Sequence, residues 1–216
     1  MGIVSTKPSG DAPPPALPQF AHIKRYWDPA IQAFAAKLLP GEYYVTEGGE
    51  AICTVLGSCI SVCARDATRN IGGMNHFMLP LDRSKGQSSW GDAGSAATRY
   101  GNVAMERMIN DMLKCGARRT DLQFKLIGGG KVLAAMTDVG ATNIEFVRRF
   151  MKTEGLYVVG EDLGDIFPRK VQFFPDSGRV RVKRLASTVN NAIFARERSH
   201  LQDLTATPQA GDVELF

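Results

Sequence analysis

The sequence predicts an α+β fold with a substantial antiparallel sheet. Short segments rich in β-branched and aromatic residues outnumber the helical segments. Several of them follow one another with only a turn between them, which favours antiparallel strands over alternating β-α-β units. The chain has 216 residues, of which 44% are hydrophobic and 22% are charged. This composition is that of an ordinary globular protein, and it excludes collagen-like, coiled-coil and wholly disordered classes.

Eight strands are predicted, over residues 42–46, 51–56, 59–64, 71–78, 122–127, 156–160, 170–174 and 180–183. Each is short and is bounded by turn residues such as Gly57-Ser58. Residues 176–178 (Asp-Ser-Gly) form a good hairpin turn between the last two strands. The polar, Gly/Ser-rich stretch 82–97 is predicted as a long loop, which is either passive or able to close over a bound side chain.

Four helices are predicted, over residues 29–39, 98–114, 143–152 and 187–196. In the first, Pro29 occupies the first turn and Pro40 ends the helix. In the second, apolar residues recur at i, i+3, i+4 and i+7 from Met105, and Gly116 stands where a C-terminal cap would lie. Asn143 is predicted to cap the third helix, because its side chain can accept a bond from a free backbone N–H.

One domain with two flanking segments is predicted. Residues 1–28 contain five prolines and little apolar periodicity, so they are expected to be disordered or extended. Residues 29–198 form the domain, and residues 199–216 form a polar tail. The start of the chain lacks the pattern of a secretory signal, and no apolar run reaches the roughly 18 residues of a membrane helix. These observations predict a cytoplasmic protein without membrane insertion.

Charge and cysteine content exclude several kinds of site. The formal net charge of +4 is too small to indicate nucleic acid as a partner. The cysteines form no CxxC pair, and the three histidines give no zinc-ligand spacing. The sequence therefore predicts free thiols at Cys53, Cys59, Cys63 and Cys115, with no metal and no cofactor. Buried structural roles are expected for Cys63 and Cys115.

Two further patterns have ordinary explanations. The glycines at 128–130 are followed by Lys131, but no phosphate-loop frame surrounds them, so a strand-to-helix turn is predicted. Residues 169–198 hold eight Lys and Arg against two acidic residues. Such a cluster is usually a solvated face, and it also suits an encounter with acidic partners. No aromatic stacking motif accompanies it, which argues against nucleic acid.

The candidate chemistry lies at Cys59 and His76. Cys59 follows Gly57-Ser58 at a break between two apolar strands, where backbone N–H groups can point at a substrate. His76 lies within an apolar strand, and an imidazole beside a thiol can take its proton. By pattern alone, the same residues also fit a turn with a buried thiol and a hydrogen-bonded core histidine.

Five segments together resemble one known family: LGSC at 56–59, GGMNHFMLP at 72–80, YGNVAMERMINDMLKCGA at 100–117, KLIGGGKVL at 125–133 and LYVVGEDLGD at 156–165. Over about residues 41–184 the chain is similar to CheD, the chemoreceptor glutamine deamidase of bacterial and archaeal chemotaxis. The resemblance implies a layered α/β/β sandwich like the deamidase domain of cytotoxic necrotizing factors. It also implies a thiol hydrolase that acts on glutamines in the cytoplasmic domains of methyl-accepting chemotaxis receptors.

The resemblance also implies roles for three residues. Cys59 corresponds to the nucleophile and His76 to the general base and acid. The family's third residue is a threonine before the cysteine, and the nearest here is Thr54. An odd separation places Thr54 on the opposite face from Cys59 in a regular strand, unless Gly57 forms a bulge. Backbone N–H groups near residues 58 and 59 are expected to stabilise the oxyanion.

Two other functions stay open at this point. One is a non-catalytic adaptor that regulates chemotaxis by contact with receptors or with the CheC phosphatase, a partner of CheD in some species. The other is a thiol protease or esterase that uses the same pair of residues on a different bond. The presence of both Cys59 and His76 favours catalysis over the adaptor. A monomer is expected, since no dimer motif is evident.

Overall fold

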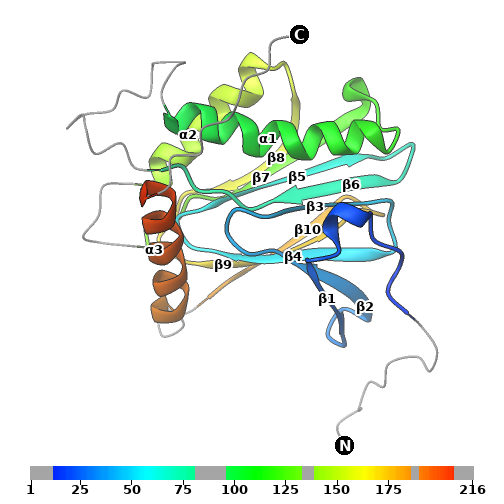
Figure 1. Cartoon of the computed structure of the whole chain (residues 1–216), viewed down its shortest axis with the longest axis horizontal. Helices are drawn as coiled ribbons and strands as arrows, with labels where there is room; N and C mark the ends of the chain where they lie inside the picture. The colour runs from blue at the N-terminus through cyan, green and yellow to red at the C-terminus, as the bar shows by residue number, and fades with distance from the viewer. Residues whose placement is uncertain (1–11, 81–95, 133–138, 186–189, 207–216) are drawn as a thin grey trace, which may run out of the picture.

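The computed structural model describes residues 12–80, 96–132, 139–185 and 190–206. These residues form two five-stranded sheets. Helices α1 (Ala96–Lys114) and α2 (Val139–Thr153) cover the outer face of one sheet, and the second sheet packs on its other face (Figure 1). The predicted α+β class is confirmed, with its layers in the order helices, sheet, sheet. In the described helices, none is long and apolar enough to cross a membrane.

The sheet beneath the helices consists of β3 (Tyr43–Thr46), β6 (Ile71–Asn75), β5 (Ile60–Asp66), β7 (Leu122–Gly128) and β8 (Tyr157–Leu163), in that order. Its strands are antiparallel except for the last pair, β7 and β8. The central strand β5 is almost entirely buried, because a sheet lies on one side of it and helices lie on the other. Strand β6 ends at Asn75, three residues earlier than predicted.

The outer sheet consists of β1 (Lys24–Asp28), β2 (Ala33–Lys37), β4 (Glu50–Leu56), β9 (Arg169–Phe174) and β10 (Arg179–Arg184), in that order. Strands β9 and β10 form the predicted hairpin, in which Gly178 has a φ of 69° and its N–H donates to Phe174 O at 2.8 Å. Consecutive strands β4 and β5 belong to different sheets, so the chain crosses the sandwich between them at residues 57–59.

The helix predicted over 29–39 is wrong. Residues 33–37 form strand β2, which pairs antiparallel with β1 and parallel with β4. Pro29 lies in the turn between β1 and β2, where Gln32 adopts a φ of 52°. Ala35 and Ala36 are fully buried within the sheet. An alanine-rich segment this short gains little from helix formation alone, so pairing with two neighbouring strands decides its structure.

Helix α1 buries the apolar face that the sequence predicts, against the sheet that contains β6. Met105, Met108 and Met112 of α1 are fully buried. They pack on β6, where a Cβ at Gly73 would lie 3.0 Å from the sulfur of Met112. Asn143, by contrast, does not cap α2. That helix begins at Val139, so Asn143 lies one turn inside it, and its side chain is fully buried.

The folded part of the chain is longer than predicted at both ends. Phe20 is 2% exposed and packs on the rings of Tyr43 and Tyr44, so the core includes residues before 29. Helix α3 (Asn190–Ala206) extends past residue 196 into the predicted polar tail. The predicted loop 82–97 lies almost wholly outside the described residues, as do residues 1–11 and 207–216.

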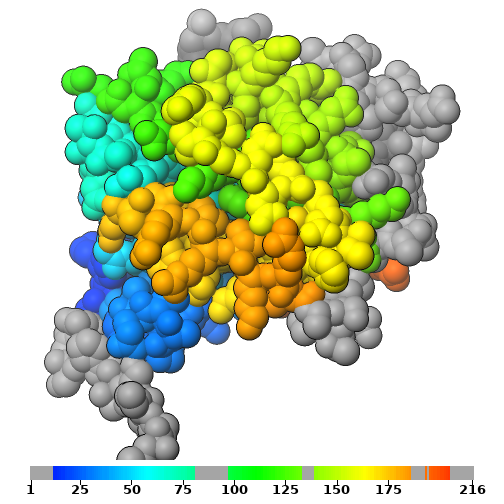
Figure 2. Space-filling view, turned by 180° about the vertical axis from the view of Figure 1, so that it is seen from behind, coloured from blue at the N-terminus to red at the C-terminus, as the bar shows by residue number. Residues whose placement is uncertain are grey.

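The basic cluster at 169–198 is only partly a solvated face. Strand β10 lies at the surface of the face shown in Figure 2 (orange), and its Arg179 and Arg181 are exposed and stack on Phe174. Arg169, however, is fully buried, and its guanidinium bonds to Asp162 and to the Gly164 carbonyl. Arg169 therefore ties β9 to the end of β8 and is not available to a partner.

Candidate active site

The loop at residues 57–59, here called the nucleophile loop, is held from behind by three hydrogen bonds. Gly130 N–H donates to Gly57 O at 2.9 Å, and Gly129 N–H donates to Cys59 O at 2.8 Å. The Asn143 side-chain amide donates to Ser58 O at 2.9 Å. All three carbonyls of the loop are thus bound on one side. The N–H groups of the same residues are left to point to the other side.

The glycines at 128–130 make this support possible. Gly128 has a φ of 117°, and a Cβ there would lie 2.2 Å from Cys59 O. A side chain at this position would push the nucleophile loop away from β7. The glycine run therefore serves a close approach between two backbone segments, and a phosphate is not needed to explain it.

The N–H groups of the nucleophile loop converge on one carboxylate, that of Glu197 in α3. Gly57 N–H donates to Oε1 at 2.7 Å, and Ser58 N–H donates to Oε2 at 2.9 Å. The Ser58 hydroxyl donates to Oε2 at 2.8 Å, and Cys59 N–H reaches Oε1 at 3.5 Å. Successive N–H groups that point to one spot form an anion-binding concavity. The same donors suit the oxyanion of an acyl-transfer reaction.

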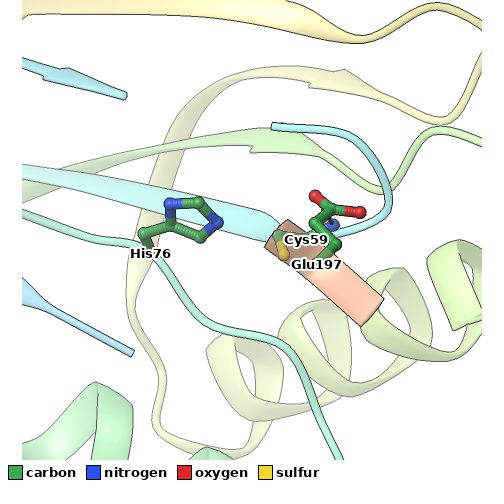
Figure 3. Close-up of side chains that lie close together, drawn as sticks. All are labelled: Cys59, His76 and Glu197. Carbon is green, nitrogen blue, oxygen red and sulfur yellow. Dashed lines mark hydrogen bonds between the residues drawn. The ribbon is translucent and has the colours of Figure 1, made fainter. Parts of the chain in front are cut away.

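The structure brings Cys59 and His76 together at this concavity. His76 follows β6, and its N–H donates to Glu42 O, while Phe77 bridges to Ile60 at the start of β5. Cys59 Sγ, a ring nitrogen of His76 and a carboxylate oxygen of Glu197 all lie within 4.8 Å of one another. Figure 3 shows the His76 ring with one nitrogen directed toward Cys59.

Thr54 fixes the tautomer of His76. Its hydroxyl lies 2.9 Å from Leu38 O and 2.7 Å from His76 Nδ1. A carbonyl oxygen only accepts, so the hydroxyl donates to Leu38 O and accepts a bond from Nδ1–H. Nε2 then carries a lone pair. Within the described residues, Nε2 is buried and has no hydrogen-bond partner. A base that accepts the proton of a thiol is expected to have such a free lone pair.

The prediction that Thr54 lies on the opposite face from Cys59 applies to a regular strand without a bulge at Gly57. It assumed one strand through both residues, whereas Thr54 lies in β4 and Cys59 precedes β5 in the other sheet. Because the chain passes from one sheet to the other between them, the alternation of side chains in β4 does not determine which way Cys59 points. Thr54 points into the space between the sheets, and Cys53 points the other way, where its sulfur lies 3.3 Å from the Tyr26 hydroxyl.

Burial holds both members of the Cys59–His76 pair in their neutral forms. The pKa of Cys59 is raised well above its usual value, first by burial and then by the Glu197 carboxylate beside it. The pKa of His76 is lowered to about 3, mainly by burial and further by His200 and Arg196 of α3. Cys59 is 0% exposed and His76 is 2% exposed. The site as it stands is therefore closed, with a neutral thiol beside a neutral imidazole.

The remaining cysteines stand apart from the site. Cys63 is 1% exposed within the core, and burial raises its pKa, as expected for a structural thiol. Cys115 is half-buried, which differs from its predicted burial. It follows the last residue of α1, where the helix leaves the core for the surface.

Three potential metal ligands meet in the site, although the sequence spacing predicts none. Thiolate, imidazole and carboxylate are ligands that zinc accepts, and the atoms of Cys59, His76 and Glu197 lie close enough to share an ion. Both Glu197 oxygens, however, already accept bonds from the nucleophile loop. A metal would have to compete with these donors for the carboxylate.

Sequence reasoning missed Glu197 and the supporting roles of Asn143 and the glycines. The signal for Glu197 was its spacing: Ile193, Glu197 and Leu201 recur every four residues and occupy one helix face, which puts the acid between two apolar neighbours. No comparable signal marks Asn143, because a buried amide and an N-cap look alike in sequence.

Several known proteins are similar to this chain over most of its length. Over 204 residues, 94% of each chain, the protein is 55% identical to the "Probable chemoreceptor glutamine deamidase CheD" of Halorhodospira halophila. The chain belongs to the CheD family. A protein of the same name from Hahella chejuensis is 47% identical over 94% of this chain and 95% of its own. A third, from Hydrogenovibrio crunogenus, is 48% identical over 88% of this chain and 97% of its own.

The CheD family model, described as CheD chemotactic sensory transduction, matches residues 78–184. This range contains the glycine run and Asn143, which support the nucleophile loop. It begins after His76, and Cys59 also lies outside it. The longer matches to the individual CheD relatives confirm the family resemblance drawn from the motifs.

Proposed function

We propose that this CheD-family protein is a protein-glutamine deamidase with Cys59 as nucleophile, His76 as general base and acid, and Thr54 as the residue that orients His76. One observation carries the proposal. The lone pair of His76 Nε2 lies beside the Cys59 sulfur, and the N–H groups of the nucleophile loop converge at the same point. The names of the CheD relatives support glutamine as the residue acted on.

In the first half of the reaction, a glutamine side chain occupies the concavity with its carbonyl oxygen at the N–H groups of Gly57, Ser58 and Cys59. Nε2 takes the Cys59 proton, and the thiolate attacks the amide carbon to form a tetrahedral oxyanion. The donors face this oxygen, which stabilises the charge. His76 then gives its proton to the departing nitrogen. The C–N bond breaks, ammonia leaves, and a thioester remains on Cys59.

In the second half, a water molecule replaces ammonia. Nε2 removes a proton from it, and the resulting hydroxide attacks the thioester carbon. The C–S bond breaks, the sulfur regains its proton from His76, and the side chain leaves as glutamate. Thr54 keeps Nδ1 protonated throughout, so that Nε2 is the atom that exchanges protons in both halves.

The proposed substrates are the cytoplasmic domains of chemotaxis receptors. The CheD relatives are named as chemoreceptor glutamine deamidases. In addition, the exposed side chains of Arg179, Arg181 and Lys183 make the edge strand β10 positively charged. Such a field speeds the encounter with acidic receptor helices. We place the protein in the cytoplasm as a monomer, with CheC as a candidate partner.

Mass spectrometry of receptor cytoplasmic fragments tests this function. Fragments incubated with the wild type should gain glutamate at specific glutamines. Cys59→Ala should abolish conversion, and His76→Ala should slow it by about 10² or more. Cys115→Ser, which alters a thiol outside the site, should convert at the wild-type rate. Conversion by Cys59→Ala at the wild-type rate would contradict the proposal. So would a wild type that binds receptors in the same way as Cys59→Ala and converts nothing, because that is the behaviour of an adaptor.

A further inference from the structure

Helix α3 stands across one end of both sheets, apart from the layer formed by α1 and α2 (Figure 1). Among its described side chains, Ile193, Glu197 and Leu201 are buried and lie one turn apart. Half-buried His200 also packs on the chain at Gly41, where an added Cβ would lie 3.0 Å from the His200 ring. Arg196 and Arg198, on either side of Glu197 in the sequence, are exposed. Ile193, Glu197 and Leu201 thus form a buried stripe along the helix. At the centre of the stripe, where an apolar residue would suffice for packing, the chain has a carboxylate.

For packing alone, a carboxylate at position 197 is less favourable in free energy than an apolar side chain. Glu197 is 2% exposed, and no ion pair is formed by it within the described part of the chain. A buried carboxylate costs free energy unless hydrogen bonds replace its hydration. Here the replacement comes from the nucleophile loop. The fit is close enough that a Cβ at Gly57 would lie 2.7 Å from Oε2. Glu197 and the nucleophile loop are thus matched to each other.

The group held there has the chemical structure of a reaction product. A carboxylate at the end of two methylenes is what remains when a glutamine side chain loses its amide nitrogen. Its two oxygens use the donors that an oxyanion needs, and it lies beside Cys59 and His76 (Figure 3). We propose that α3 is a built-in mimic of the product, which closes the active site and must leave before a substrate glutamine can enter. This inference rests on the proposed deamidase function.

Closure by α3 acts in two ways. It is steric, because Cys59 is 0% exposed under the helix and no donor of the nucleophile loop remains free for a substrate. It is also chemical, because the negative charge of Glu197 favours the protonated form of the Cys59 thiol. A receptor helix that presents a glutamine in the position of Glu197 competes with α3 for the same contacts. Activity then depends on how well the substrate or a partner displaces α3.

Alkylation of Cys59 measures closure without any catalysis. We would treat the full-length wild type, Glu197→Ala and Leu201→Asp with iodoacetamide under native conditions, in the presence of EDTA so that no metal protects the thiol. Peptide mass spectrometry then follows Cys59. Glu197→Ala should react at least about tenfold faster than the wild type, since hydrogen bonds to a charged group are among the stronger ones. Leu201→Asp should do the same, because a buried, unpaired charge undocks the helix.

The two variants separate access from thiol chemistry. Glu197→Ala also removes a charge that raises the Cys59 pKa, whereas Leu201→Asp keeps Glu197 in the chain. Arg198→Ala is the matched control, because it changes an exposed residue next to Glu197 and should label at the wild-type rate. A cooperative thermal transition in each variant shows that it is folded. Equal labelling of the wild type, Glu197→Ala and Leu201→Asp would overturn the closure by α3.

Glu197→Gln tests the mimicry itself, because it turns the mimic of the product into a mimic of the substrate. We expect Cys59 to attack the new amide, ammonia to leave, and water to release glutamate at position 197. Peptide mapping should therefore find glutamate at position 197 in purified Glu197→Gln and glutamine there in Glu197→Gln/Cys59→Ser. If Glu197→Gln is active on receptor fragments and yet keeps its own glutamine, the mimicry is overturned.

The outcomes distinguish this inference from the proposed function. Faster labelling of Glu197→Ala, with no conversion of receptors by any variant and none at position 197 of Glu197→Gln, would leave α3 as a cover but remove the deamidase. Unchanged labelling, together with conversion of receptors by the wild type, would leave the deamidase and remove the cover.

Discussion

The nucleophile loop is held very differently from behind and from in front. Behind it, backbone groups of Gly129 and Gly130 and the Asn143 amide bind its three carbonyls, and all of them belong to the layered core. In front, one carboxylate of α3 binds its N–H groups, on a helix that stands apart from α1 and α2. The rear contacts form with the core itself. If α3 leaves as proposed, the front contacts are lost and the rear contacts remain.

This difference separates the two requirements of catalysis. Oxyanion donors must keep a fixed geometry, because donors that reorganise during the reaction lose most of their value. Access must change, because the substrate has to enter. Here rigidity comes from the core and access is controlled by a separate helix. Variants behind the loop should therefore reduce stability and activity together, and variants in front should change accessibility with little loss of stability.

Gly128→Ala should have the largest effect, since it breaks the rear contact. The new Cβ would lie 2.2 Å from Cys59 O, at a φ of 117° that alanine rarely adopts. We expect a loss of more than about 4 kcal/mol in the free energy of unfolding, or no folded protein. Gly155→Ala is the matched control: its φ is 60°, nothing lies within 4 Å of the added carbon, and a loss of about 1 kcal/mol is expected. Urea unfolding compares the two, and equal losses would contradict the claim of a close approach.

Asn143→Ala should have the next largest effect. The variant leaves Ser58 O and Leu79 N–H buried without their partner. Each such group costs about 1–3 kcal/mol, so a loss of about 2–6 kcal/mol is expected, with a fall in deamidation. Glu145→Ala, on the exposed face of the same helix, should stay within about 0.5 kcal/mol of the wild type. Urea unfolding and receptor conversion provide the two measurements. An Asn143→Ala protein of wild-type stability would show that α2 does not support the loop.

Thr54→Val should mainly affect kcat. It keeps the shape of the side chain and removes the hydroxyl that accepts from His76 Nδ1–H. An unpaired Nδ1–H costs about 1–3 kcal/mol when buried, which corresponds to a loss of about tenfold or more in rate if the tautomer or ring orientation changes. Thr54→Ser retains the hydroxyl and should restore most of the activity. Equal kcat values for Thr54→Val and Thr54→Ser would reduce Thr54 to a packing residue.

How much of this arrangement the sequence predicts depends on whether the decisive contact is local. The face of α1 and the turn at 176–178 follow from neighbouring residues, and both are confirmed. The sequence predicts a helix in place of strand β2 because the strand depends on partners in β1 and β4, which are invisible in a local window. The direction of the Thr54 side chain relative to Cys59 depends on the passage of the chain from one sheet to the other after β4. The alternation of side chains within one strand does not predict that passage.

The site shows the same limit. Cys59 and His76 can be found in the sequence because a family resemblance and a thiol–imidazole pairing both point to them. Asn143 and Glu197 reach the nucleophile loop across separations of 85 and 139 residues. Only the folded chain brings such residues together, and polar residues with these spacings occur throughout the sequence.

The smallest expected effect is a dependence of stability on pH. Burial lowers the pKa of His76 to about 3, whereas in the unfolded chain an imidazole has a pKa of about 6.5. Between these values the unfolded state binds a proton that the folded state excludes. The free energy of unfolding should thus fall as the pH is lowered below 6.5, by at most about 1.4 kcal/mol per pH unit for this residue. Urea unfolding at pH 7, 6 and 5 should show this slope, and His76→Gln should reduce it.

The origin of this slope sharpens the comparison between front and back. His200 and Arg196, which add to the effect of burial on the pKa of His76, both belong to α3. If α3 supplies most of the burial as well, Glu197→Ala should admit water to the imidazole, raise its pKa toward its ordinary value of about 6.5 and flatten the slope. Arg198→Ala should keep the wild-type slope. A Glu197→Ala protein with the full slope would show that the two sheets bury His76 by themselves. The helix would then control access to Cys59 but not the proton affinity of its partner.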